Sequence, residues 1–178
     1  TASFLEPTTG KQKEAGIKYL AKSGNTSAAF AWFDIEETNR VVQGATPGGV
    51  EQVGALTKGW EIEIKHRVGA LELLANYMQL DAINGTTKKR LSSVAEKVAS
   101  AWGQYHFGNG WRIGLGGRYI GNVTGANSLP VVPSVTLFDA MVGYTVDQWD
   151  FRFDVRNLAD KEYVSWCRSV NNDCGYGD

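Results

Sequence analysis

Apolar and polar residues alternate along this chain in unusually long runs. Successive side chains of a strand point to opposite faces, so each run predicts a strand with one apolar and one polar face. Most runs span ten to thirteen residues. A globular strand usually has about five to six residues, whereas a tilted strand needs roughly nine to eleven to cross a bilayer. Eight strands are predicted, at 11–21, 25–37, 57–68, 71–81, 97–107, 111–121, 134–146 and 149–158.

The charged faces of these strands indicate which side meets lipid. In "WEIEIKHRV" (60–68) and "WDFRFDVRN" (149–157), apolar side chains occupy one face and charged side chains the other. An Arg or Lys facing lipid at mid-bilayer costs roughly 2–4 kcal/mol, so the charged face should line the lumen of a barrel. The predicted lumen-facing charges are Glu61, Glu63, Lys65, Arg67, Asp150, Arg152, Asp154 and Arg156.

The connections between the strands alternate in length, which supports a membrane barrel. Tight turns such as "AKSGN" (21–25) and "GNG" (108–110) alternate with long polar segments. Bacterial outer-membrane barrels have this arrangement, with short periplasmic turns and long extracellular loops. Aromatic residues expected in the interfacial girdle near the short turns are Tyr19, Phe107, Trp111, Tyr144 and Trp149. The expected extracellular loops are 38–56, 82–96, 122–133 and 166–178.

Composition excludes several other classes of protein. The formal net charge of −1 gives no field that would favour nucleic acid. No run approaches the roughly 18 apolar residues of a membrane helix. Cys167 and Cys174 have six residues between them and suit a small surface disulfide rather than a metal site. By parity, His66 belongs to the lipid-facing set and His106 to the lumen-facing set, and no catalytic set is evident, so no enzyme is expected.

With these features in view, the chain resembles the C-terminal part of a TonB-dependent outer-membrane receptor for ferric siderophores. The resemblance runs in order along the 178 residues, which are taken as one barrel portion, 1–178. The family's strand motifs are similar to "GKQKEAGIKY" (10–19), "GWEIEIK" (59–65), "GLGGRYIGN" (114–122), "LPVVPSVTLFDAMVGY" (129–144) and "VRNLADKEYVSWC" (155–167).

The resemblance implies a fold and a function. The fold is an all-β antiparallel transmembrane meander, about eight strands of a 22-stranded barrel in a Gram-negative outer membrane, as a fragment without the plug and the final strand. The function is import of ferric siderophores, energised by TonB through that plug. The disulfide pair, Cys167 and Cys174, looks most like that of hydroxamate (ferrichrome-type) receptors, where it lies in the last extracellular loop.

The same resemblance suggests where the ligand binds. Iron would arrive as a ferric-siderophore complex that carries its own oxygen ligands, so neither a cofactor nor a protein metal site is expected. The candidate contacts on the last loop are Trp166, Arg168 and Tyr176, although rim packing or ordinary loop solvation would explain the same residues.

Three alternatives remain open from the sequence. The eight strands could close a complete small outer-membrane barrel with a structural or adhesion role. They could also form a soluble ligand-binding β domain. Within the receptor interpretation, the lumen charges could pair across strands or hold the plug.

Overall fold

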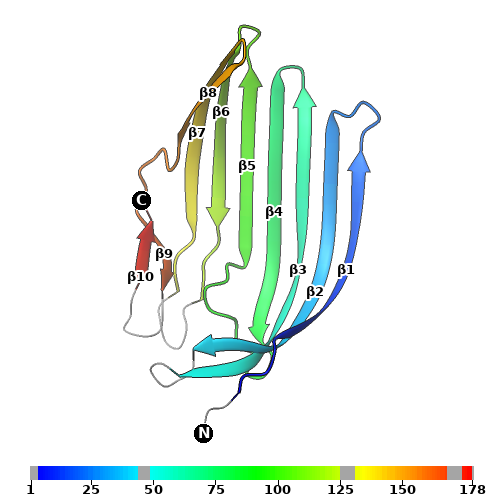
Figure 1. Cartoon of the computed structure of the whole chain (residues 1–178), viewed down its shortest axis with the longest axis vertical. Helices are drawn as coiled ribbons and strands as arrows, with labels where there is room; N and C mark the ends of the chain where they lie inside the picture. The colour runs from blue at the N-terminus through cyan, green and yellow to red at the C-terminus, as the bar shows by residue number, and fades with distance from the viewer. Residues whose placement is uncertain (1–3, 44–48, 125–130, 168–173, 178) are drawn as a thin grey trace.

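The computed structural model describes residues 4–43, 49–124, 131–167 and 174–177, and it contains one long antiparallel meander (Figure 1). Eight strands pair in sequence order, each with its neighbour. No helix that could span a bilayer occurs in this part of the chain. The strands are β1 (Thr9–Leu20), β2 (Thr26–Gln43), β3 (Val50–Val68), β4 (Leu71–Asn84), β5 (Lys97–His106), β6 (Trp111–Ile120), β7 (Val135–Val146) and β8 (Trp149–Val155).

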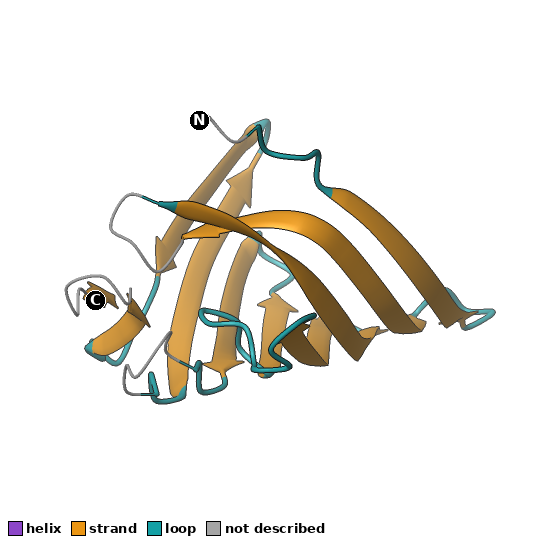
Figure 2. Cartoon of the chain, turned by 90° about the horizontal axis from the view of Figure 1, so that it is seen from below, coloured by secondary structure: helices purple, strands orange, loops and turns teal. Residues whose placement is uncertain are grey.

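The all-β antiparallel prediction is confirmed, and the sheet is open. Within the described residues β1 and β8 are the two edges and do not pair with each other, so these strands do not themselves close a small barrel. Figure 2 shows that the sheet is strongly curved, as a segment of a barrel wall would be. A second, two-stranded sheet pairs β9 (Tyr163–Cys167) with β10 (Cys174–Gly177).

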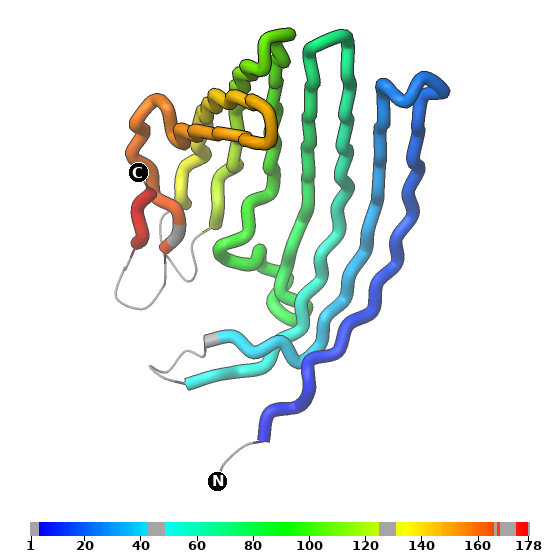
Figure 3. Tube along the Cα trace, turned by 45° about the horizontal axis from the view of Figure 1, so that its top comes forward, coloured from blue at the N-terminus to red at the C-terminus, as the bar shows by residue number. Residues whose placement is uncertain are grey.

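The β2–β3 hairpin is longer than the sequence predicted. β2 continues to Gln43 and β3 begins at Val50, so most of the segment 38–56 is strand rather than loop. The register shifts between Glu37 and Arg40, and Asn39 between them has a φ of 57°. Such a bulge bends a hairpin. Figures 1 and 3 show the outer arms turned sideways across the end of the sheet that carries the long loops.

The short turns have the backbone conformations that their residues favour. Gly110, in the β5–β6 turn, has a φ of 88°, and an added Cβ would lie 2.4 Å from the carbonyl oxygen of Thr145. Asp147, in the β7–β8 turn, has a φ of 50°, a left-handed conformation that Asp tolerates better than most residues. These turns fix the register of the hairpins and hence which side chains share a face.

β8 ends three residues earlier than predicted because a bulge follows it. Asn157 has a φ of 50°, and the amide of Leu158 donates to the carbonyl of Phe138 at 2.6 Å. In a regular ladder Asn157 would oppose Phe138, since Val155 pairs with Ala140. One extra residue is therefore accommodated here, and the chain leaves the sheet toward β9.

Candidate functional site

The predicted lumen-facing charges of β3 share one face of the sheet with those of β8. Along β3 the register places Glu61, Glu63 and Lys65 opposite Ala31, Ala29 and Ser27 of β2. The registers of the following strand pairs, from β3–β4 to β7–β8, place Asp150, Arg152 and Asp154 of β8 on the same face of the sheet. Arg156 follows the last residue of β8 and is exposed. We call this side of the sheet the charged face.

On the charged face, four arginines have carboxylate partners. Arg67 on β3 pairs with Glu72 on β4, and Arg112 on β6 pairs with Asp150 on β8. Arg152 pairs within its own strand with Asp154 at 2.7 Å. Arg118 on β6 pairs with Asp139 on β7 at 3.0 Å. Ion pairing therefore involves part of the predicted set, and the other members of these pairs are Glu72, Arg112, Arg118 and Asp139.

Three predicted charges of β3 are not paired in this way. No ion pair of Glu61, Glu63 or Lys65 occurs among the residues that the structure describes. Their neighbours on β2 are small, and those on β4 are Met78, Asn76 and Leu74. Within the described part of the wall, these three charges therefore have no ion-pair partner.

A hollow of about 1080 Å³ lies over the small residues of β2. Its charged walls are Glu14 and Lys18 of β1 and the two carboxylates of β3, Glu61 and Glu63. Most of the lining residues have the parity of the charged face, so the sheet is concave on that side across β1 to β5. This is the curvature expected when the charged face lines a lumen.

The opposite face carries a continuous exposed apolar belt. Large apolar side chains stand on it in every strand, and many are 40–70% exposed. Near the short turns the rings of Trp111 and Tyr144 lie 4.7 Å apart. Farther along the strands, the ring of Trp60 lies 5.1 Å from that of Tyr77 and 6.2 Å from that of Phe30. We call these two groups of rings, one near the short turns and one around Trp60, the two aromatic bands.

The distance between the two bands suits a membrane. From Trp60 to Val68 there are eight residue steps, which at about 3.3 Å each and a tilt of about 40° rise roughly 20 Å. The apolar band of an outer-membrane barrel is about 25 Å tall. Just beyond the upper band, Lys13, Asp34, Lys58 and Asp81 oppose one another across four strands, and Lys58 lies 3.1 Å from Asp34.

The two histidines lie on the faces that parity predicted. His66, on the apolar face near a short turn, is hydrogen-bonded through Nδ1 to the hydroxyl of Thr26 at 2.8 Å. His106, on the charged face, is 2.8 Å from the amide of Gln104 and 3.8 Å from the carboxylate of Glu72. Each histidine thus has a polar side chain within hydrogen-bonding distance, as expected for a structural role.

Asp139 organises the end of β8, a role that the sequence analysis missed. Its carboxylate accepts the backbone N–H of Asn157 at 2.9 Å in addition to pairing with Arg118. The side chain of Asn157, which is 8% exposed, donates to the carbonyl of Lys161 and accepts the amide of the same residue. The parity of Asp139 in "LFDAMVGY" is a signal that could have placed it on the charged face.

The packing of Trp102 on the neighbouring strand is a second feature that alternation alone does not predict. Its indole ring covers Gly114 and Gly116 on the charged face. A Cβ added at Gly114 would lie 2.4 Å from the ring, and one added at Gly116 would lie 2.3 Å from it. The signal in the sequence is the repeated glycine of "GLGG". Two glycines at alternate positions leave space on one face of the strand, and a large side chain of the neighbouring strand can fill it.

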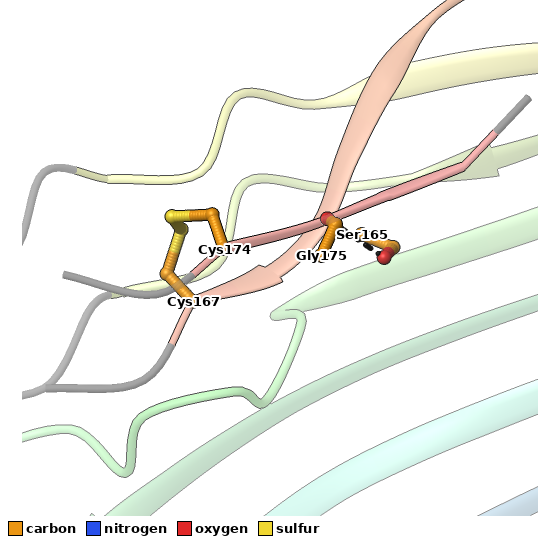
Figure 4. The surroundings of a disulfide bond; sticks show 4 residues. All are labelled: Ser165, Cys167, Cys174 and Gly175. Atoms are coloured by element: carbon orange, nitrogen blue, oxygen red, sulfur yellow. Dashed lines mark hydrogen bonds between the residues drawn. A yellow bond between two sulfur atoms is a disulfide. The ribbon is translucent and has the colours of Figure 1, made fainter. Parts of the chain in front are cut away.

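The long-loop end carries the disulfide hairpin (Figure 4). Cys167 on β9 and Cys174 on β10 are directly opposed and form a disulfide. The hydroxyl of Ser165 donates to the carbonyl of Gly175 at 3.0 Å, next to this bond. Tyr176 is 76% exposed on β10. Arg168 and the side chain of Trp166 lie outside the described part of the structure.

The described residues hold no group of three or more His, Cys, Asp or Glu side chains placed to bind a metal ion. The candidate site therefore consists of two surfaces. One is the charged face with its hollow, and the other is the set of hairpins at the long-loop end.

Comparison with known proteins identifies the family to which this β-meander belongs. The family model described as "TonB dependent receptor-like, beta-barrel" matches residues 1–158. The ferrioxamine B receptor of Salmonella typhimurium is 33% identical over 98% of this chain. The ferrichrome outer membrane transporter and phage receptor of Escherichia coli is 33% identical over 93% of it. The chain spans only 27% and 24% of the length of these two relatives.

A solved structure agrees in fold. The ferric-catecholate import receptor Fiu of Escherichia coli superimposes with a TM-score of 0.77 at 25% identity, over 97% of this chain and 26% of that one. The relatives are named as receptors and transporters, which supports the prediction that the chain is not an enzyme. Receptor barrels of this family lie in the outer membrane of Gram-negative bacteria. The chain belongs to the TonB-dependent receptors, as part of their β-barrel.

Proposed function

We propose that this chain is part of the wall of a receptor that imports ferric siderophores of the hydroxamate class across the outer membrane. The observation that carries this proposal is the 33% identity, over nearly the whole chain, to receptors named for ferrioxamine B and ferrichrome. The ligands in both names are ferric hydroxamates. The catecholate siderophore receptor Fiu is less similar, at 27% identity over 90% of the chain.

The proposal assigns a solvent to each face of the wall. The apolar face, with its two aromatic bands, meets lipid, where burying it is favourable. The charged face meets the lumen, because facing its arginines toward lipid would cost roughly 2–4 kcal/mol each at mid-bilayer. The concavity of the charged face over β1 to β5 supports this assignment.

The lumen of the full-length receptor would hold a plug that TonB acts on. Glu61, Glu63 and Lys65 support this part of the proposal, because they have no ion-pair partner among the described residues, and the two glutamates line the hollow. A plug with complementary charges would supply partners for these three side chains. Arg67, Arg112 and Arg152 already have carboxylate partners and are less available to it.

The ferric siderophore would bind at the long-loop end. Trp166, Arg168 and Tyr176 are the proposed contacts, and the exposed ring of Tyr176 on the disulfide hairpin is compatible with that role. Aromatic and polar surface is sufficient for such a ligand, because the siderophore itself supplies the oxygen atoms that bind iron. Neither a resident cofactor nor a protein ligand to iron is needed.

The test is equilibrium binding to the full-length receptor in detergent, followed by quenching of tryptophan fluorescence. Ferrioxamine B and ferrichrome, both loaded with iron, are compared with a ferric catecholate. Saturable quenching by a hydroxamate, and none by the catecholate, is the expected result. A folded receptor that binds the catecholate and neither hydroxamate would overturn the ligand class and leave the barrel assignment standing.

A further inference from the structure

The side chain of Gln52 ties two separate segments together at the long-loop end. Its amide oxygen accepts the backbone N–H of Glu6 at 2.9 Å. Its amide nitrogen donates to the carbonyl of Glu6 at 2.7 Å and to the carbonyl of Asn39 at 2.9 Å. Both ends of the amide are therefore used, so only one orientation of the side chain satisfies all three hydrogen bonds.

These bonds meet at the kink of the β2–β3 hairpin. Asn39, which has a φ of 57°, lies where the register of β2 against β3 shifts. The hydroxyl of Thr8 also donates to the backbone carbonyl of Asn39 at 3.0 Å. The side-chain amide of Asn39 donates to the backbone carbonyl of Pro7 at 3.3 Å. The segment before β1 is thus fastened to the hairpin where it bends.

The bend determines where the outer arms of the hairpin lie. Beyond the kink, the arms pair from Arg40 with Val53 to Gln43 with Val50. Figures 1 and 3 show them crossing the long-loop end of the sheet toward the side that carries the β9–β10 hairpin. Without the bend, the arms would continue along the strand direction, away from that side.

We propose that Gln52 is a positioning residue for ligand capture, which holds the β2–β3 hairpin across the mouth of the receptor. The inference rests on the proposed function. When a binding-competent arrangement is only partly populated, the apparent dissociation constant rises by the inverse of that population. Releasing the hairpin therefore weakens capture of the siderophore and leaves the later, TonB-driven step unchanged.

The experiment is uptake of iron-55 ferrioxamine B by cells that carry the full-length receptor. Gln52→Leu removes all three hydrogen bonds, and Gln52→Glu keeps the acceptor for Glu6 N–H but loses the donor to both carbonyls. We expect both variants to raise the KM by about tenfold with Vmax unchanged. Gln12→Leu is the matched control, because among the described residues the side chain of Gln12 is hydrogen-bonded only to Glu14 of its own strand.

A second measurement follows the hairpin itself. Val50, at the start of β3, is 59% exposed and can carry a nitroxide label as Val50→Cys in the purified receptor. We expect Gln52→Leu to increase the mobility of this label and Gln12→Leu to leave it unchanged.

The outcomes separate the inference from the proposed function. A receptor that takes up no ferric hydroxamate contradicts the proposed function. Normal uptake with an unchanged KM in Gln52→Leu overturns the inference alone, as does a label at Val50 that Gln52→Leu does not mobilise. A fall in Vmax together with loss of folded receptor would show a merely structural role and would also overturn it.

Discussion

The guanidinium Nε of Arg118 on β6 lies 3.0 Å from the carboxylate of Asp139 on β7, and the same carboxylate accepts the backbone N–H of Asn157. Asp139 thus links β6, β7 and the bulge that ends β8. The bulge directs the chain toward the disulfide hairpin. Its geometry therefore depends on a carboxylate in the neighbouring strand.

Asp139→Ala should loosen the segment after β8. The substitution leaves the backbone N–H of Asn157 and the guanidinium of Arg118 without their acceptor, at a cost of roughly 1–3 kcal/mol. Asp139→Asn keeps an acceptor oxygen and should be milder. Protease cleavage between β8 and β9 in the full-length receptor measures the effect, with Glu162→Ala as the exposed control. Equal cleavage of Asp139→Ala and Glu162→Ala would be inconsistent with this role.

Gly114→Ala should destabilise the wall through Trp102. The new Cβ would meet the indole ring at 2.4 Å, and overpacking of this kind costs about 1–3 kcal/mol. The midpoint of the heat-modifiability transition of the full-length barrel should fall. Trp102→Leu in the same chain should restore much of the loss, because the atoms nearest the new Cβ belong to Trp102. Gly117→Ala, whose Cβ would lie 3.3 Å from Phe138, is the control.

Ile64→Arg should impair membrane insertion, whereas Lys65→Leu should leave it nearly intact. The two residues are adjacent on β3 but lie on opposite faces. An arginine on the lipid face costs roughly 2–4 kcal/mol at mid-bilayer. Lys65 has no ion-pair partner to lose among the described residues. The heat-modifiable fraction in outer membranes measures insertion. Similar losses in the two variants would contradict the assignment of the faces.

Replacing both cysteines, as Cys167→Ser with Cys174→Ser, should release the β9–β10 hairpin and leave the barrel wall intact. For so short a loop, chain-entropy arithmetic gives about 2 to 3 kcal/mol of local ordering. Amide hydrogen exchange at Val164 and Gly175 should accelerate, while exchange in β3 and β4 should not change. Acceleration throughout the sheet would show that the disulfide stabilises the whole wall.

The faces of the strands could be predicted from the sequence because strand alternation has a period of two and lipid excludes charge. Along β3, Glu61 to Arg67 kept this pattern without interruption, and the register agrees with it. The outer arms of β2 and β3 were missed for the opposite reason. Beyond Glu36 apolar and polar residues no longer alternate along the hairpin, although the ladder continues to Gln43 and Val50.

Contacts between distant segments could not be predicted in this way. Gln52 reaches the backbone of Glu6 across 46 residues, and Asp139 reaches the amide of Asn157 across 18. Each depends on a bulge that brings a backbone group to the side chain, and alternation carries no information about bulges. The pairing partners of Arg67 and Arg112 likewise required the register between strands.

The assignment of the two faces is the claim on which the account depends, and nitroxide accessibility tests it directly. Labels at Ile64→Cys and Lys65→Cys are compared in the full-length receptor reconstituted into liposomes, with oxygen and a water-soluble nickel chelate as relaxing agents. We predict that the label at 64 is relaxed by oxygen and the label at 65 by the nickel chelate or shielded from both. A label at 65 relaxed mainly by oxygen, with the label at 64 relaxed by nickel, would contradict the account.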